Sequence, residues 1–202
     1  IMLIVAPGCC GRNTSLISSM PEYNDRFFYL MMDETDIVTG RHLKKIPKAV
    51  KEICDCCEKK PSVVMICITC VDALLGTDME RVCRKAEEKV DIPVRPCYMY
   101  ALTREGRKPP MVHVRQSLYS LLEPQKKKGN VVNLLGFFSP LVDDCELYDL
   151  LHQAGVKTIH EISRCKDYEE YRTMSQANFN LVLHPEARFA AEDFHNRLKI
   201  PF

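Results

Sequence analysis

The side chains with the clearest chemical potential are cysteines that directly follow two short apolar runs. Residues 2–6 are followed by Cys9 and Cys10, and residues 63–68 are followed by Cys70. If the two runs are parallel strands of one open sheet, their carboxyl ends meet at the edge where such sheets bind ligands. Thiolates at that edge are natural ligands of a metal ion or an iron-sulfur cluster. We therefore take Cys9, Cys10 and Cys70 as candidate ligands, and expect at most one of the adjacent pair to ligate.

The elements around these cysteines have the pattern of a parallel α/β sheet. Short apolar runs rich in β-branched or aromatic residues, typical of strands covered on both faces, occur at residues 2–6, 27–31, 63–68 and 93–99. Apolar residues at helical spacing predict helices at 43–54 and 79–90, the second opened by Thr77 and Asp78 as capping residues. The order β-α-β-α then places the cysteines at one edge of the sheet.

A second unit follows a polar segment. Residues 123–130 combine charge with Pro and Gly, which predicts a linker or an exposed crossover. Beyond it, strands are predicted at 131–138, 156–162 and 180–183, and helices at 143–154, 168–176 and 186–198. We therefore predict an α/β protein of two Rossmann-like domains, residues 1–124 and 125–202, each with a parallel sheet flanked by helices.

Composition narrows the class of partner and compartment. The 28 Lys and Arg residues nearly balance the 27 Asp and Glu residues, so the net charge of the chain does not favour binding to nucleic acid or to an anionic membrane. No apolar run approaches the roughly 20 residues that span a bilayer. The 11 cysteines are scattered rather than packed into a small disulfide framework. We expect a cytoplasmic protein whose cysteines are mostly buried packing residues.

Three segments carry motifs of a known family. Residues 6–10 read Ala-Pro-Gly-Cys-Cys, residues 34–40 read Glu-Thr-Asp-Ile-Val-Thr-Gly, and residues 70–78 read Cys-Val-Asp-Ala-Leu-Leu-Gly-Thr-Asp. They resemble the Gly-Pro-x-Gly-Cys, Glu-x-Asp-Ile-Val-x-Gly and Cys-x5-Gly-Asp-Asp segments of the nitrogenase component 1-type oxidoreductases. Residues 130–136 are similar to the strand that opens that family's second domain. Such proteins usually have three Rossmann-like domains, so the resemblance implies that this chain represents about two of them.

The resemblance implies an iron-sulfur site. Cys10 and Cys70 fall on the family's cluster-ligand positions, and Cys9 falls on the preceding glycine. Two thiolates do not complete a four-ligand set, so a 4Fe-4S cluster would be shared between subunits of a homodimer, or of a heterodimer with a related subunit. Asp33 is a weaker candidate for a missing ligand. Leu183 and His184 stand where nitrogenase has a cofactor cysteine, so we do not predict a molybdenum cofactor.

The implied function is electron transfer. In this family an ATP-dependent reductase iron protein passes electrons to the cluster, and the chain would relay them at low potential to a reducible substrate. No glycine-rich phosphate loop is present, so we expect no nucleotide on this chain. The alternative is a non-catalytic scaffold or carrier for a metal cluster or a tetrapyrrole precursor, and a third option is a relative that binds no metal. Enzymatic activity and the identity of the substrate stay open.

Two further features have competing interpretations. His184 follows a predicted strand, where it would face the ligand-binding crevice or serve a structural role. Cys67 and Cys70 have the spacing of a redox dithiol, but Cys67 lies within an apolar strand rather than at a helix start, so we do not expect thiol exchange there.

Overall fold

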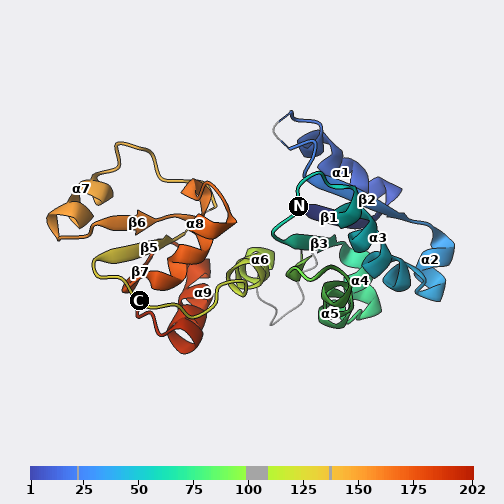
Figure 1. The fold of residues 1–202 in the computed structure, drawn as a ribbon. Helices are drawn as coiled ribbons and strands as arrows, with labels where there is room; N and C mark the ends of the chain where they lie inside the picture. The colour runs from blue at the N-terminus through green and yellow to red at the C-terminus, as the bar shows by residue number, and fades with distance from the viewer. Residues whose placement is uncertain (22, 99–108, 137) are drawn as a thin grey trace. The chain divides into compact units, whose positions relative to one another are not determined.

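The chain forms two compact units, residues 1–117 and 118–202. Figure 1 shows a computed structural model, which describes residues 1–21, 23–98, 109–136 and 138–202. The boundary between the units lies within helix α6 (Pro110–Tyr119), a few residues before the polar segment that suggested a domain boundary at residue 124.

Unit 1 is a parallel sheet with helical connections. Its strands are β1 (Met2–Pro7), β2 (Phe27–Met32), β3 (Val64–Ile68) and β4 (Val94–Tyr98). Its helices before α6 are α1 (Gly8–Ser18), α2 (Glu34–Thr39), α3 (His42–Cys56), α4 (Cys70–Leu75) and α5 (Met79–Val90). The strand order is β2-β1-β3-β4, and every pairing is parallel. The predicted strand at 93–99 corresponds to β4, and its last residue, Met99, lies outside the described residues.

The core of unit 1 lies between this sheet and the pair of helices α3 and α5, which contact each other (Figure 1). Val5 and Ile66 from the sheet are fully buried in the same cluster as Ile46 and Val50 of α3 and Ala86 of α5. The helical spacing of the apolar residues in both helices creates the face that packs here. β1 and β3 are the two central strands and are buried in this core, so the packing of the core holds their carboxyl ends in place.

Unit 2 is a smaller parallel α/β unit. Its strands are β5 (Val131–Leu135), β6 (Thr158–His160) and β7 (Phe179–Val182), in the order β6-β5-β7. Its α-helices are α7 (Glu146–Gln153), α8 (Tyr168–Arg172) and α9 (Arg188–Asp193). It also has the short 3-10 helices η1 (Ile162–Arg164), η2 (Thr173–Gln176) and η3 (Pro185–Ala187), and the short π-helix η4 (Phe194–Leu198). The two helices predicted at 168–176 and 186–198 are therefore each divided into consecutive helical types.

A buried amide pair holds two strands of unit 2 together. Asn133 of β5 donates to the side-chain oxygen of Asn180 in β7 at 2.8 Å and to the carbonyl of Met174 at 3.0 Å. Both asparagines are fully buried, so these bonds compensate part of the cost of removing amides from water.

The polar segment 123–130 has no helix or strand, and it packs against unit 2. Lys127 Nζ donates to the carbonyl of Ser175 at 2.8 Å, and Gln125 bonds Arg172 and Gln176.

No helix among the described residues is long and apolar enough to cross a membrane.

Candidate functional site

The sheet brings the candidate cysteines to one edge. β1 pairs directly with β3, with Val5 opposite Ile68. The chain leaves β1 into α1, whose first turn contains Cys9 and Cys10, and it leaves β3 into α4, which begins at Cys70. All three cysteines therefore follow the carboxyl ends of adjacent parallel strands, where open α/β sheets bind ligands.

The thiols at this edge influence one another electrostatically. Cys10 is half-buried beside exposed Cys9, and their Sγ atoms lie 3.9 Å apart. Burial raises the pKa of the Cys10 thiol above its ordinary value, and the hydrogen bond with Cys9 and the charges of Cys9 and Cys70 act in the same direction. Because these effects oppose ionisation of Cys10, a cation bound beside it would favour its thiolate form. The chemistry of this donor set suits a thiophilic metal or an iron-sulfur cluster.

The first turn of α1 lies beside Met31 of β2. A Cβ atom added to Gly8 would lie 3.5 Å from Met31 Cε, and one added to Gly11 would lie 3.6 Å from Met31 Sδ. The Met31 side chain therefore packs under the turn that carries Cys10. This contact limits how far that turn can move from the end of β2.

Cys70 begins a short helix that was not predicted from the sequence. α4 covers six residues and ends at Gly76, whose φ of 66° is the left-handed conformation that favours glycine. Asp72 in its first turn is buried and bonds buried His42 at the start of α3. Sequence reasoning missed this pair, although a charged residue inside the otherwise apolar stretch 70–75 was a visible signal.

One chain supplies only part of a cluster's ligands. Across residues 1–21, 23–98, 109–136 and 138–202, no group of three or more His, Cys, Asp or Glu side chains is arranged to hold a metal ion. Asp33, the weaker candidate, caps α2 by accepting a 2.7 Å hydrogen bond from the backbone N–H of Asp36. Cys10 and Cys70 are thiol donors of the kind that an iron-sulfur group takes, and the described residues bring no third ligand to them.

The other singled-out side chains have local partners. Cys67 is buried and lies opposite buried Cys97 in the register of β3 and β4, so it faces the interior rather than Cys70. His184 precedes η3, and its Nδ1 atom accepts a 3.3 Å hydrogen bond from the backbone N–H of Glu186. His184 therefore has a capping role in the structure.

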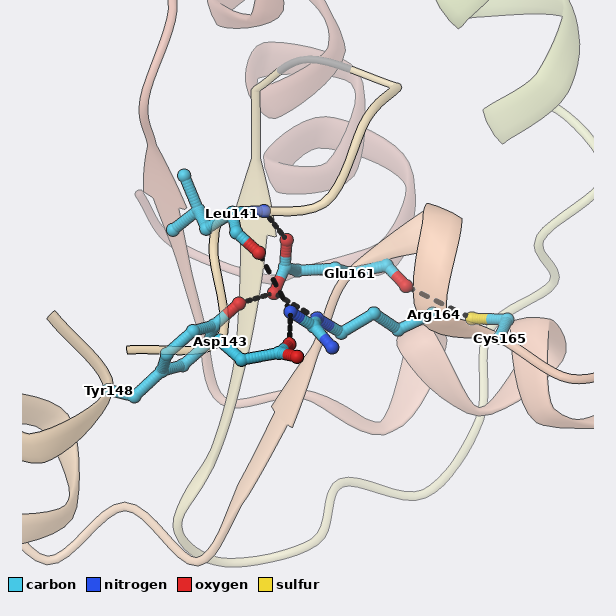
Figure 2. Close-up of polar contacts among 6 residues, drawn as sticks. All are labelled: Leu141, Asp143, Tyr148, Glu161, Arg164 and Cys165. Atoms are coloured by element: carbon cyan, nitrogen blue, oxygen red, sulfur yellow. Dashed lines mark hydrogen bonds and ion pairs between the residues drawn. The ribbon is translucent and has the colours of Figure 1, made fainter. Parts of the chain in front are cut away.

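A polar network in unit 2 was not predicted from the sequence (Figure 2). Buried Glu161 accepts hydrogen bonds from the backbone N–H of Leu141 at 3.0 Å, from Arg164 Nε at 3.2 Å and from the Tyr148 hydroxyl. Arg164 also bonds exposed Asp143 at 2.6 Å. Burial and the bond to Glu161 raise the pKa of Tyr148, so its hydroxyl remains the donor. The network ties the loop after β5 to η1.

The same network borders an open pocket of about 430 Å³. It is lined by Asp143, Tyr148, His152, Lys157, Thr158, Ile159 and Arg164. Arg164 and Tyr148 of this lining already bond within unit 2.

The family model of the nitrogenase component 1-type oxidoreductases matches residues 1–202. The chain belongs to this family. The predicted family is thereby confirmed. Curated relatives include the nitrogenase iron-molybdenum cofactor biosynthesis protein NifE of Nostoc sp., 27% identical over 90% of this chain, and that of Rhodobacter capsulatus, 26% identical over 99% of it.

Solved structures show the same fold. Nitrogenase Cp1 at pH 6.5 superposes with a TM-score of 0.67 at 22% identity over 96% of this chain, and the structure at pH 5 gives 0.65. This likeness and the parallel sheets confirm the predicted fold class of Rossmann-like α/β units. The chain spans 38% and 43% of the Nostoc and Rhodobacter proteins and 40% of nitrogenase Cp1 at pH 6.5.

Proposed function

We propose that this chain binds an iron-sulfur cluster through Cys10 and Cys70, in a site completed by a second chain. The observation that carries the proposal is the placement of both thiols directly after adjacent parallel strands. A 4Fe-4S cluster takes four cysteine ligands in its usual form. Two copies of this chain, or this chain and a related subunit, supply that number across a shared interface.

Exposed apolar side chains beside Cys70 support a protein partner at this edge. Leu74 and Leu75 in α4 have exposed fractions of 64% and 53%, and Met31 at the end of β2 is 50% exposed. Apolar side chains gathered around a polar site are a common feature of protein interaction surfaces. Burying them against a second chain would also exclude water from a cluster held there.

The principal role that we propose is relay of low-potential electrons to a reducible substrate. When bound, a cluster supplies one-electron transfer, at a potential set by hydrogen bonds to its sulfurs and by exposure to solvent. The chain contributes the thiolates and the strand ends that hold them, and the adjoining backbone N–H groups are candidate donors to the cluster sulfurs. The proposed electron donor is an ATP-dependent reductase iron protein.

The second candidate is a scaffold or carrier that assembles or transfers a metal cluster. It is favoured by the curated relatives reported above, which are iron-molybdenum cofactor biosynthesis proteins. The two roles differ in the fate of the cluster. A relay keeps its cluster through repeated reduction and reoxidation, whereas a carrier loses it to an acceptor protein.

The experiment that tests cluster binding is measurement of iron and acid-labile sulfide in protein purified without oxygen, with an electron paramagnetic resonance spectrum after reduction. We expect about two irons per chain, since a four-iron cluster would be shared by two chains. Native mass spectrometry should show the iron only in a two-chain species. Iron-free protein after anaerobic reconstitution, alone and with a related subunit, would refute the proposal.

A further inference from the structure

Helix α4, which places Cys70, is too short to be stable by itself. It has six residues, whereas isolated helices shorter than about 12 residues are marginal even in favourable sequences. Thr69 precedes it as the N-cap but makes no capping bond with its side chain. Contacts from elsewhere in unit 1 must therefore hold α4 in place.

The strongest such contact is a buried histidine–aspartate pair. His42 Nε2 lies 3.0 Å from Asp72 Oδ1, and the two side chains are 1% and 0% exposed. The Thr77 hydroxyl donates to the same carboxylate oxygen at 3.2 Å, and the backbone N–H of Thr77 donates to the Asp72 carbonyl at 3.0 Å. Asp72 thus joins both ends of α4 to the first residue of α3.

Both ring nitrogens of His42 are engaged with acceptors. Nδ1 lies 3.0 Å from the backbone carbonyl of Asp36, which only accepts, so Nδ1 carries a proton. On the other side of the ring, Nε2 faces the Asp72 carboxyl group. The ring orientation is therefore set by α2 on one side and by α4 on the other.

The far end of this connection is also anchored. Asp36 is buried in α2, and its carboxylate accepts from Lys45 at 2.6 Å and pairs with Arg41 at 3.5 Å. The hydrogen bond from Lys45 holds the pKa of Asp36 below its usual range, against the effect of burial. A continuous polar chain therefore runs from α3 through Asp36 and His42 to Asp72.

Two further polar atoms near Cys70 are buried with no hydrogen-bond partner among the described residues. They are Thr69 Oγ1 and Asp72 Oδ2. Buried polar atoms without a partner lower the stability of the folded state. Here they lie one residue before and two residues after the proposed ligand.

We propose that His42 and Asp72 are positioning residues that hold Cys70 at the sheet edge for ligation. The pair fixes α4 against α3, and α3 is anchored in the core by Ile46 and Val50. Without the pair, α4 separates from the sheet and Cys70 loses its fixed place relative to Cys10. The ligand role of Cys70 rests on the proposed function, whereas the order of α4 does not.

The test compares variants of the full chain by hydrogen exchange and by iron retention. His42→Leu removes both hydrogen bonds at similar volume, while His42→Gln and Asp72→Asn keep a donor or an acceptor in place. In iron-free protein, His42→Leu should accelerate amide exchange across residues 70–75 by roughly tenfold, with α5 unchanged. His42→Gln and Asp72→Asn should each keep most of the protection from exchange that the wild-type chain shows in α4. Val82→Ala, which removes buried core atoms of α5, is the matched control for general destabilisation of unit 1.

Iron retention then tests the link to ligation. In reconstituted protein, His42→Leu should release iron faster and alter the electron paramagnetic resonance spectrum, and His42→Gln should restore both properties. Unchanged exchange in α4, or equal acceleration in α4 and α5, would overturn the positioning role. Altered exchange with wild-type iron retention would overturn its link to ligation. An iron-free wild-type protein would refute the proposed function, while the exchange data would still decide whether the pair orders α4.

Discussion

Cys10 and Cys70 follow adjacent parallel strands at the same edge of one sheet. Burial raises the pKa of Cys10, and the charge of Cys70 adds to this effect. Sixty residues separate them in the sequence, so only the pairing of β1 with β3 brings them together. The raised pKa means that the Cys10 thiol resists ionisation more than an ordinary cysteine thiol does. This relationship is the basis for the proposed cluster site.

We expect Cys10→Ala and Cys70→Ala each to lose most bound iron while the chain stays folded. Both thiols are only partly buried, so truncation removes little packing. Iron content after anaerobic reconstitution measures the loss of iron. Thermal unfolding followed by circular dichroism shows whether the chain stays folded. Cys145→Ala is the control, since that cysteine precedes α7 in unit 2. If Cys9→Ala loses iron and Cys10→Ala does not, Cys9 rather than Cys10 is the ligand.

Glu161 and Asp143 provide a matched pair of acidic partners of Arg164 (Figure 2). Glu161→Ala should destabilise unit 2 by about 1–3 kcal/mol, because it removes the buried acceptor that three donors share. Asp143→Ala should cost at most about 1 kcal/mol, because the Asp143 side chain is 91% exposed and the ion pair is screened. Urea unfolding followed by circular dichroism measures both values. Equal effects of the two substitutions would contradict the structural role given to Glu161.

Gly76 ends α4 with a φ of 66°, so a side chain there is strained even though no atom would clash with its Cβ. Gly76→Ala should lower the free energy of unfolding by about 1 kcal/mol. Gly129→Ala is the control, because its Cβ would also meet no atom and its φ is not in the left-handed range. Denaturant titration of both variants checks the difference. A similar loss in both would show that backbone conformation at Gly76 is not the cause.

The sequence predicted long, periodic elements better than short ones. Helix α5 has the predicted bounds because Asp78 caps it and its apolar residues repeat at helical spacing over three turns. Helix α4 was missed because six residues are too few for a periodic signal. Its stability depends on a bond between Asp72 and His42, which lie 30 residues apart and gave no joint signal in the sequence.

The same contrast applies to the candidate site. The cysteines were found because each follows a strand, a local feature that a sequence displays. Their mutual electrostatic effect required the strand order β2-β1-β3-β4, which places β3 beside β1. The network around Glu161 also joins residues far apart in the chain, so no single segment could reveal it.

The stability of the chain should decrease as the pH falls below about 6.5, partly because of His160. Burial lowers the pKa of this histidine in β6 from its ordinary value of 6.5, and the charge of Lys128 acts in the same direction while that of Glu170 opposes it. Well above pH 6.5 the ring is neutral in both folded and unfolded chains, so it adds nothing to the pH dependence of the free energy of unfolding. As the pH falls below 6.5, the unfolded chain takes up the proton first, which favours unfolding. His160→Gln should therefore show a shallower loss of stability than the wild type between about pH 7 and pH 5, measured by urea unfolding at each pH. Parallel pH profiles for the two proteins would show that His160 does not couple protonation to folding.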